Sequence, residues 1–112
     1  MKAEDKKAAA RAWKERKSEP GLYAIRCAPA ALAWVGRASD LGTVRTRIWF
    51  ALRLGSSPHR ALQQAWRDHG EAAFTFETLE RIEEEDISPE LLALKLRNRL
   101  DHWAGALAAQ KI

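Results

Sequence analysis

Two short runs of residues decide the fold, Gly21-Leu22-Tyr23 and Trp34-Val35-Gly36, and their aromatic residues stand eleven positions apart. Each run combines an aromatic residue and a glycine in a β-prone segment, the first over residues 22–27 and the second over residues 32–35. Residues 28–31 between them (Ala-Pro-Ala-Ala) indicate a turn. We therefore predict a β-hairpin that lays Tyr23 beside Trp34, with glycine where the backbone or a ligand comes close.

The rest of the chain predicts helices and one further strand. Residues 4–17 are rich in Ala, Lys, Arg and Glu and lack Gly and Pro, which favours a helix in an N-terminal extension over residues 1–18. The other expected elements are a helix over 41–53 capped by Asp40, a helix from Ser57-Pro58 to His69, a strand over 74–80 and a helix over 89–109.

These elements predict a small α+β domain over residues 19–112. The expected order is α-β-β-α-α-β-α, with a three-stranded antiparallel sheet flanked by helices. Apolar residues at helical spacing predict the faces that point inward. They are Leu41, Val44, Ile48, Ala51 and Leu52; then Leu62, Ala65 and Trp66; and finally Leu92, Leu96, Leu100, Trp103 and Leu107. Five tryptophans indicate either a well-anchored core or an aromatic binding surface.

The composition is that of a globular chain with one modest core. The chain has 112 residues, of which 46% are hydrophobic and 30% are charged. No apolar run approaches the roughly 18 residues that a membrane span needs. The first seven residues carry charge with no apolar stretch behind them, which argues against a secretory signal. The single cysteine, Cys27, excludes an internal disulfide and a Cys-rich zinc site. We expect a reducing, cytoplasmic setting.

Positive charge is concentrated on the segment that contains the two aromatic runs. Residues 21–70 carry seven Arg and only two acidic residues, whereas residues 71–87 carry seven acidic residues and one Arg. The planar guanidinium of Arg suits phosphate, so this distribution favours a nucleic-acid partner. Many basic domains bind no nucleic acid, and charge alone leaves both possibilities open.

Several features, in order, resemble the GIY-YIG nuclease family. Gly21-Leu22-Tyr23 and Trp34-Val35-Gly36 match the two tripeptides for which the family is named. An Arg-bearing helix, a Gly-Ser break at 55–57, the run from Ala61 to Gly70 and the strand over 74–80 follow at matching intervals. The resemblance covers roughly residues 20–105. It implies an α+β domain that hydrolyses phosphodiester bonds with the help of one Mg²⁺ or Mn²⁺ ion. It favours DNA over RNA as the substrate.

The resemblance assigns roles to residues of the hairpin. Tyr23 matches the tyrosine that helps to activate the attacking water. Because a free phenol has a pKa of about 10, Tyr23 would need a nearby cation to act as a base. The alternative is a tyrosine packed in the hairpin. Trp34 stands where the family usually has a second tyrosine, and we expect a structural role because indole only donates hydrogen bonds. Arg37, directly after Gly36, is a candidate phosphate contact.

The family's catalytic arginine lies on the helix after the second tripeptide. Direct counting from Gly36 reaches Val44, on the inward stripe. Arg45 and Arg47 lie at the two edges of that stripe, roughly 100° and 60° from Val44 around the helix. Either is a candidate for the catalytic arginine, with preference for Arg47. The alternative is a pair of solvated surface arginines.

Histidines provide further candidates. Some family members have a histidine just after the Gly-Ser break, where this chain has Ser57 and, two residues later, His59. We expect His59 and Arg60 in the first turn of their helix, where free backbone N–H groups favour phosphate. Exposed His and Arg at a helix start are also common without a ligand. His69 is explained as favourable charge at a helix C-terminus.

The metal ligand departs from the family pattern. The family uses a glutamate on the last helix, and the matched position falls near Asn98. Asp101, on the same face one turn later, is the candidate substitute, because a hard cation needs carboxylate oxygen. Glu77 is the other carboxylate of note, and we expect it to face solvent from its strand.

Three functions therefore compete. The leading hypothesis is a GIY-YIG-type endonuclease acting through Tyr23 and Arg47 or Arg45. The second is a nucleic-acid-binding module that keeps the fold but has lost the metal site, as Asn98 and Trp34 suggest. The third is a protein-interaction domain that uses its Trp-bearing helices.

Overall fold

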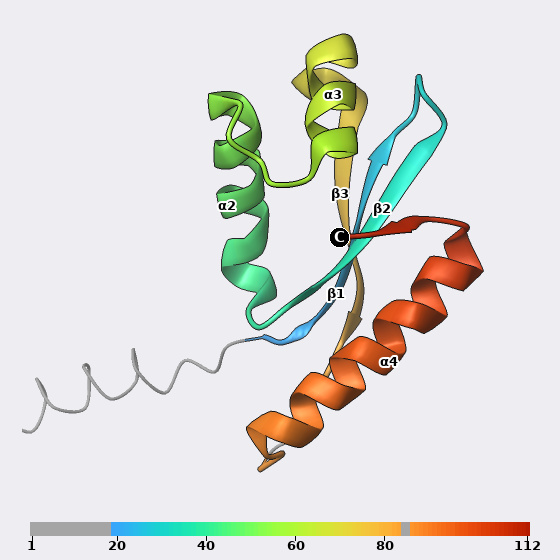
Figure 1. Cartoon of the computed structure of the whole chain (residues 1–112). Coiled ribbons are helices and arrows are strands. Elements are labelled where there is room, and N and C mark those ends of the chain that lie inside the picture. The colour runs from blue at the N-terminus through green and yellow to red at the C-terminus, as the bar shows by residue number, and fades with distance from the viewer. Residues whose placement is uncertain (1–18, 84–85) are drawn as a thin grey trace, which may run out of the picture.

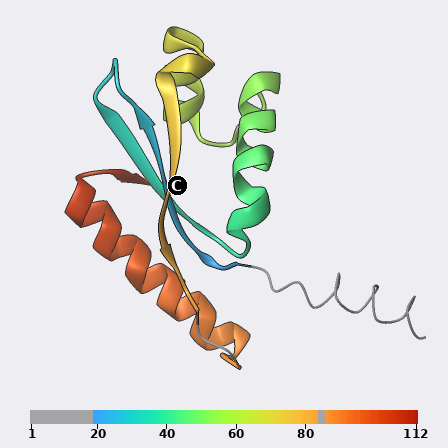
Figure 2. The same ribbon diagram turned by 180° about the vertical axis from the view of Figure 1, so that it is seen from behind.

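The computed structural model describes residues 19–83 and 86–112, in which a sheet separates two helices on one face from a third on the other (Figures 1 and 2). The expected helix over residues 4–17 lies outside the described residues. The elements are β1 (Gly21–Cys27), β2 (Leu32–Ala38), α2 (Leu41–Leu54), α3 (Arg60–His69), the 3₁₀ turn η1 (Glu71–Ala73), β3 (Phe74–Arg81), α4 (Pro89–Leu107) and β4 (Gln110–Lys111). Within the described part of the chain, no helix has the length and apolar character needed to cross a bilayer.

The sheet has four strands in the order β3-β1-β2-β4, which corrects the expected three-stranded antiparallel sheet. β1 pairs antiparallel with β2 and with β3, as predicted. The additional strand β4 runs parallel to β2, with Trp34 opposite Gln110 and Val35 opposite Lys111. At the end of α4, Ala108 adopts a left-handed conformation (φ 50°) and the chain returns to the sheet. A two-residue strand has no alternation of its own, so the sequence did not predict it.

Helices α2 and α4 begin where the sequence predicts. The Asp40 carboxylate accepts a hydrogen bond from the Gly42 backbone N–H at 3.0 Å and caps α2. The Ser88 hydroxyl accepts one from the Leu91 N–H at 3.2 Å and caps α4. Each cap satisfies a backbone donor that the first turn of a helix leaves free.

Helix α3 begins two residues later than expected. Its first residue is Arg60, and His59 occupies the N-cap position without a side-chain capping bond. The Ser57 hydroxyl does not cap the helix, because it accepts a hydrogen bond from the His59 N–H at 3.2 Å. Ser57 and Pro58 therefore form the approach to α3.

The sheet divides the interior into two cores. Successive residues of a strand point to opposite faces, so Tyr23 and Ile25 of β1 face α2 and α3, whereas Leu22 and Ala24 face α4. The first core also holds the predicted inward residues of α2 and α3 except Ala51, with Ile48 partly buried. The second core receives the predicted apolar stripe of α4.

Aromatic rings form a continuous series through the first core. Tyr23 stacks on Phe76 with ring centroids 5.1 Å apart, and Trp49 of α2 meets Phe76 edge-on at 6.0 Å. Trp66 of α3 packs against Trp49 at 5.5 Å. The series ends with Phe74 and Trp34, with centroids 5.2 Å from Trp66 to Phe74 and 6.3 Å from Phe74 to Trp34. Three of the tryptophans therefore serve the core, and Trp13 lies outside the described residues.

Helix α4 is fixed to the other face of the sheet by a shared carboxylate. Glu80 of β3 accepts hydrogen bonds from Arg99 Nε at 2.8 Å and from Trp103 Nε1 at 2.9 Å. Partial burial opposes the charge of Glu80, but the bonds from Trp103 and Arg99 outweigh it and hold the pKa of this carboxyl below its ordinary value. Trp103 thus contributes both apolar surface and a donor that positions α4.

Gly36 makes room for the Tyr23 ring. The two residues are paired across β1 and β2. A Cβ atom added at Gly36 would lie 2.3 Å from the Tyr23 hydroxyl oxygen and 2.4 Å from the carbon that bears it. The ring cannot move freely away, because Tyr23 is only 5% exposed and stacks on Phe76. The second glycine of the hairpin is therefore required by the position of the phenol.

We expect Gly36→Ala to lower the free energy of unfolding by about 1–3 kcal/mol, because the added methyl group overpacks a filled site. Urea unfolding followed by tryptophan fluorescence measures the change. Gly105→Ala is the matched control, since nothing lies within 4 Å of its added Cβ and alanine favours the helix. Equal stability of Gly36→Ala and wild type would contradict the close contact.

Candidate nucleic-acid interface

Tyr23 faces α2, the helix that bears Arg47. Tyr23 projects from β1 onto Phe76, and Arg47 is an exposed residue of α2. The positive charge of Arg47 lies close enough to act on the Tyr23 phenol. Of the two arginines that the sequence left as alternatives, Arg47 is therefore the one whose charge reaches the tyrosine.

The phenol stays protonated at neutral pH. Burial raises the pKa of Tyr23 above its ordinary value of 10.0, and the Arg47 charge offsets only part of this effect. The expectation that a cation would lower the pKa enough for Tyr23 to act as a base is not met by Arg47. In this state the hydroxyl can donate one hydrogen bond and accept others.

The Tyr23 side chain is largely buried, at 5% exposure, between Phe76 and Gly36. No residue in the described part of the chain forms a hydrogen bond with its hydroxyl. A protonated phenol within the influence of a guanidinium charge can donate a hydrogen bond to an anionic oxygen.

Arg45 occupies a different environment from Arg47. Its guanidinium carbon lies 5.7 Å from the centre of the Trp49 ring, in a cation–π contact. Val44, the position reached by direct counting, is 1% exposed and packs in the first core. Arg45 thus lies at the Trp49 edge of the helix, while Arg47 lies toward the tyrosine.

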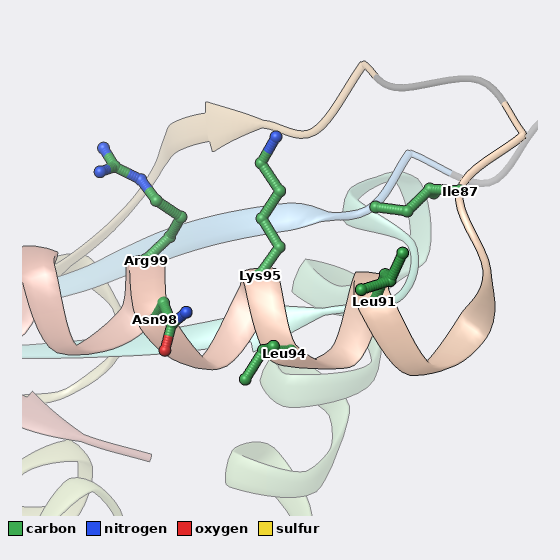
Figure 3. A pocket seen from close by; sticks show the side chains of 6 residues that line it. All are labelled: Ile87, Leu91, Leu94, Lys95, Asn98 and Arg99. Atoms are coloured by element: carbon green, nitrogen blue, oxygen red, sulfur yellow. The ribbon is translucent and has the colours of Figure 1, made fainter.

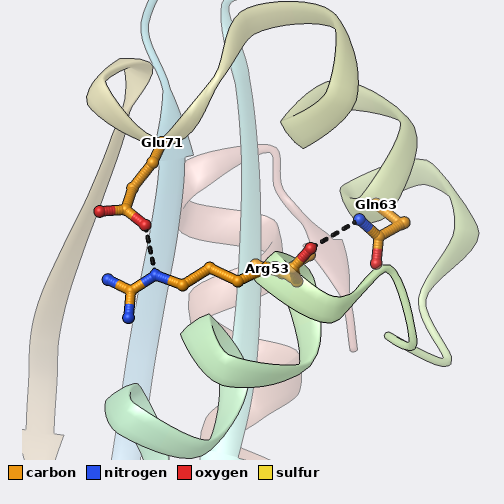
Figure 4. Close-up of polar contacts among 4 residues, drawn as sticks. Arg53, Gln63 and Glu71 are labelled. Carbon is orange, nitrogen blue, oxygen red and sulfur yellow. Dashed lines mark hydrogen bonds and ion pairs between the residues drawn. The ribbon is translucent and has the colours of Figure 1, made fainter.

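The end of α2 is held against α3 and η1 by polar contacts (Figure 4). Gln63, 6% exposed, donates its side-chain amide to the Leu52 carbonyl at 3.1 Å and accepts from the Ser57 N–H at 3.2 Å. Arg53 forms an ion pair with Glu71. The hydrogen bond from Arg53 holds the pKa of the Glu71 carboxyl below its ordinary value. The Glu71 carboxylate therefore offsets part of the positive charge of Arg53.

The candidates at the start of α3 lie on the same side of the sheet as Tyr23. His59 is half-buried at the N-cap, and Arg60 is exposed at the first helical position. Gln63 fixes the segment that carries them, through its bond to Ser57. Within the described part of the chain, neither His59 nor Arg60 interacts with Tyr23 or Arg47. His69 is exposed at the C-terminal end of α3, next to Gly70, as its expected role requires.

Arg37 lies on the opposite face of the sheet from the phenol. Trp34, Gly36 and Ala38 of β2 face α2, and alternation directs Val35 and Arg37 toward the α4 side. Arg37 is exposed there. Arg37 is thus separated from Tyr23 by the sheet.

The described carboxylates do not fit a divalent metal beside Tyr23. Asp101, the candidate ligand, lies on α4 across the sheet and pairs with Lys111 at 2.9 Å. This contact holds the pKa of the Asp101 carboxyl below its ordinary value. Glu77 of β3 is exposed, as expected, and pairs with Arg26 at 3.2 Å. No group of three or more His, Cys, Asp or Glu that could hold a metal occurs within residues 19–83 and 86–112.

Asn98, the position matched to the family's glutamate, lies in basic and apolar surroundings. It lines a hollow on the outer side of α4 (Figure 3). The other lining residues are Ile87, Leu91, Leu94, Lys95 and Arg99. Cationic and apolar neighbours disfavour a bound cation, so this position does not fit the metal either.

Two residues of this interface were missed in the sequence. Phe76 forms the surface on which the Tyr23 ring rests, and Gln63 joins α2 to α3. The alternation of residues along β3 predicts that Phe76 faces one side of the sheet. It does not show that Tyr23 of β1 faces the same side. Gln63 had no signal, because a polar residue next to an apolar stripe is usually solvated. Trp34 is 1% exposed, as its expected structural role requires.

No protein-family model matches the chain, and no curated protein matches it. Two solved structures are similar to it. One is an alanine mutant of the catalytic domain of intron endonuclease I-TevI, with a TM-score of 0.66 and 24% identity over 80% of this chain and 84% of that one. The other is the catalytic domain of homing endonuclease I-TevI, with a TM-score of 0.65 and 24% identity over 83% of this chain and 97% of that one. The chain therefore has the fold of the GIY-YIG nucleases, which its sequence resembles.

Proposed function

We propose that this chain is a DNA-binding domain built on the GIY-YIG nuclease fold, in which Tyr23 and Arg47 hold a backbone phosphate. The observation that supports the proposal is the Tyr23 phenol stacked on Phe76 in the core that α2 covers, where the charge of Arg47 on that helix acts on it. A guanidinium supplies charge and several donors, and the protonated phenol supplies one more. Both groups stabilise a phosphate oxygen without a metal ion.

The charge of the surrounding helix supports the same partner. Helix α2 contains Arg45, Arg47 and Arg53 and no acidic residue. The sequence around it, residues 21–70, has a large excess of Arg over Asp and Glu. Such an excess attracts a polyanion and makes its binding depend on salt. The resemblance to GIY-YIG nucleases favours DNA over RNA.

We expect wild-type protein to bind DNA with an affinity that falls steeply as salt rises. Arg47→Ala should lower the affinity at every salt concentration and reduce the salt slope by about one, because one phosphate contact is lost. Tyr23→Phe should lower it roughly ten-fold by removing a hydrogen bond to a charged group. Fluorescence anisotropy with labelled DNA at several salt concentrations measures both effects.

Arg37→Ala is the matched control for that measurement, since it removes an exposed arginine from the other face of the sheet. It should leave the affinity nearly unchanged. Absence of salt-dependent binding by the wild type would overturn the proposal, as would equal losses in Arg37→Ala and Arg47→Ala. A stable protein complex or dimer with no affinity for DNA would instead favour the protein-interaction hypothesis.

The state of the phenol can be tested directly, because Tyr23 is the only tyrosine in the chain. Burial raises the pKa of Tyr23, so tyrosinate absorbance should appear at higher pH than it does for a free tyrosine. Arg47→Ala should raise this pKa further by removing the charge that favours phenolate. Arg45→Ala should leave it unchanged. Ultraviolet titration, with circular dichroism to confirm that the protein stays folded, measures the shift, and an ordinary or lowered pKa would contradict the arrangement.

Metal-dependent DNA cleavage is the second candidate function. It is favoured by the likeness to endonuclease catalytic domains together with the meeting of Tyr23 and Arg47. In such a reaction Arg47 would stabilise negative charge on the phosphate, and the Tyr23 hydroxyl would orient an oxygen through a hydrogen bond. The location of Asp101 across the sheet argues against it, since a Mg²⁺ or Mn²⁺ ion would lack a carboxylate beside the phenol.

We expect no cleavage of single- or double-stranded DNA in Mg²⁺ or Mn²⁺ beyond that seen with Tyr23→Phe, because the described residues supply no suitable metal ligand. Incubation of purified protein with labelled DNA, followed by denaturing gel electrophoresis, tests this. A chelator-treated sample is the control. The opposite result would be cleavage that requires metal and is abolished by both Tyr23→Phe and Arg47→Ala. This result would establish the endonuclease and overturn a role limited to binding.

A further inference from the structure

An exposed aromatic residue lies next to the proposed phosphate site. Phe50 of α2 is 61% exposed, although the chain buries most of its other large aromatic residues. It follows Arg47 by three residues, so the two side chains are neighbours on the helix surface. Along the axis they are separated by about 4.5 Å. Leu54, a further turn along, is 64% exposed and extends this apolar stripe.

The stripe formed by Phe50 and Leu54 belongs to neither of the two cores. The inner face of α2 is already occupied by Val44, Trp49 and Leu52, which are buried in the first core. Phe50 and Leu54 therefore point away from the sheet, and their exposed apolar surface is unfavourable in water. An exposed aromatic ring in this position indicates a binding partner that covers it.

Charge complementarity identifies the partner. Helix α2 carries no acidic residue, and besides Arg53, which pairs with Glu71, it bears Arg45 and Arg47, so a partner along its outer face gains from being anionic. The partner must also present a flat apolar group beside an anionic one. A nucleotide with an unpaired base meets both requirements, since its base has an open π-face and its phosphate carries negative charge.

We propose that Phe50 stacks on an unpaired base of a DNA strand whose phosphate is held by Arg47 and Tyr23. The proposal rests on the DNA-binding function proposed above and specifies its substrate as single-stranded DNA or unpaired segments within a duplex. In a duplex, the faces of the bases are covered by neighbouring bases, so a ring on the convex surface of a helix cannot reach them. Phe50 thus adds preference for unpaired bases, while Arg47 and Tyr23 provide general affinity for the backbone.

The proposal can be tested with three oligonucleotide probes of equal length. They are a thymidine single strand, the same strand with abasic sites at every internal position, and a duplex. Wild-type protein should bind the thymidine strand most tightly. Phe50→Ala should weaken binding to that strand by about ten-fold, as expected for one stacked base. It should leave the abasic strand, the duplex and the salt slope unaffected.

Two further variants separate stacking from folding. Phe50→Trp keeps a flat ring and should retain the affinity for the thymidine strand. Leu94→Ala removes an apolar side chain of similar exposure, 52%, from α4 on the other side of the sheet and should bind all probes as the wild type does. Retention of binding by Phe50→Trp supports stacking over a general effect of truncation.

Other outcomes would overturn the inference. Equal weakening of Phe50→Ala on all three probes would assign Phe50 a structural role, and an unchanged affinity for the thymidine strand would exclude stacking. In both cases salt-dependent binding would still support the proposed function. If no probe binds, the proposed function fails and this inference fails with it. Analytical ultracentrifugation tests whether the protein forms a dimer. Loss of such a dimer in Phe50→Ala would show that the apolar stripe contacts another protein surface.

Discussion

The stacking of Tyr23 on Phe76 is the contact on which the rest of the interface depends. Phe76 lies between the tyrosine of β1 and Trp49 of α2, so the same ring supports the phenol and fixes the helix that carries Arg47. Gly36 completes the arrangement because it leaves the space that the ring occupies. The position of the arginine relative to the phenol therefore follows from packing in the first core, and the two polar groups need no direct bond between them.

This arrangement determines which chemistry the site supports. An apolar surface beneath the phenol keeps it protonated, and the neighbouring guanidinium is also a donor. Three described carboxylates that would otherwise be available as metal ligands are paired with basic side chains. These pairs are Glu77 with Arg26, Glu71 with Arg53, and Asp101 with Lys111. A site that contains donors and lacks free carboxylates favours an anionic ligand over a cation, and this is the basis for preferring phosphate binding to metal-dependent hydrolysis.

The sheet separates this interface from the scaffold that supports it. On its second face, Glu80 joins Arg99 and Trp103 and holds α4 against the strands. Asn98, the position matched to the family's glutamate, and Asp101, the candidate substitute, both belong to this helix, and Arg37 also lies on that face. They are therefore remote from Tyr23 for one common reason, which is that they lie across the sheet. Helix α2, by contrast, has a buried side that builds the first core and an outer side, with Arg47 and Phe50, that is open to a ligand.

The sequence by itself determined the hairpin, the caps at Asp40 and Ser88, the inward faces of the helices and the likeness to GIY-YIG nucleases. These features depend on local periodicity and backbone preference, which neighbouring residues reveal. Only the tertiary structure revealed β4, showed that the charge of Arg47 acts on Tyr23, and separated Asp101 from Tyr23. Each of these depends on which face of the sheet an element covers and how rings pack against each other, and such contacts join residues far apart in the chain. Residue spacing therefore identified the groups capable of binding phosphate, and packing across the sheet decided which of them meet.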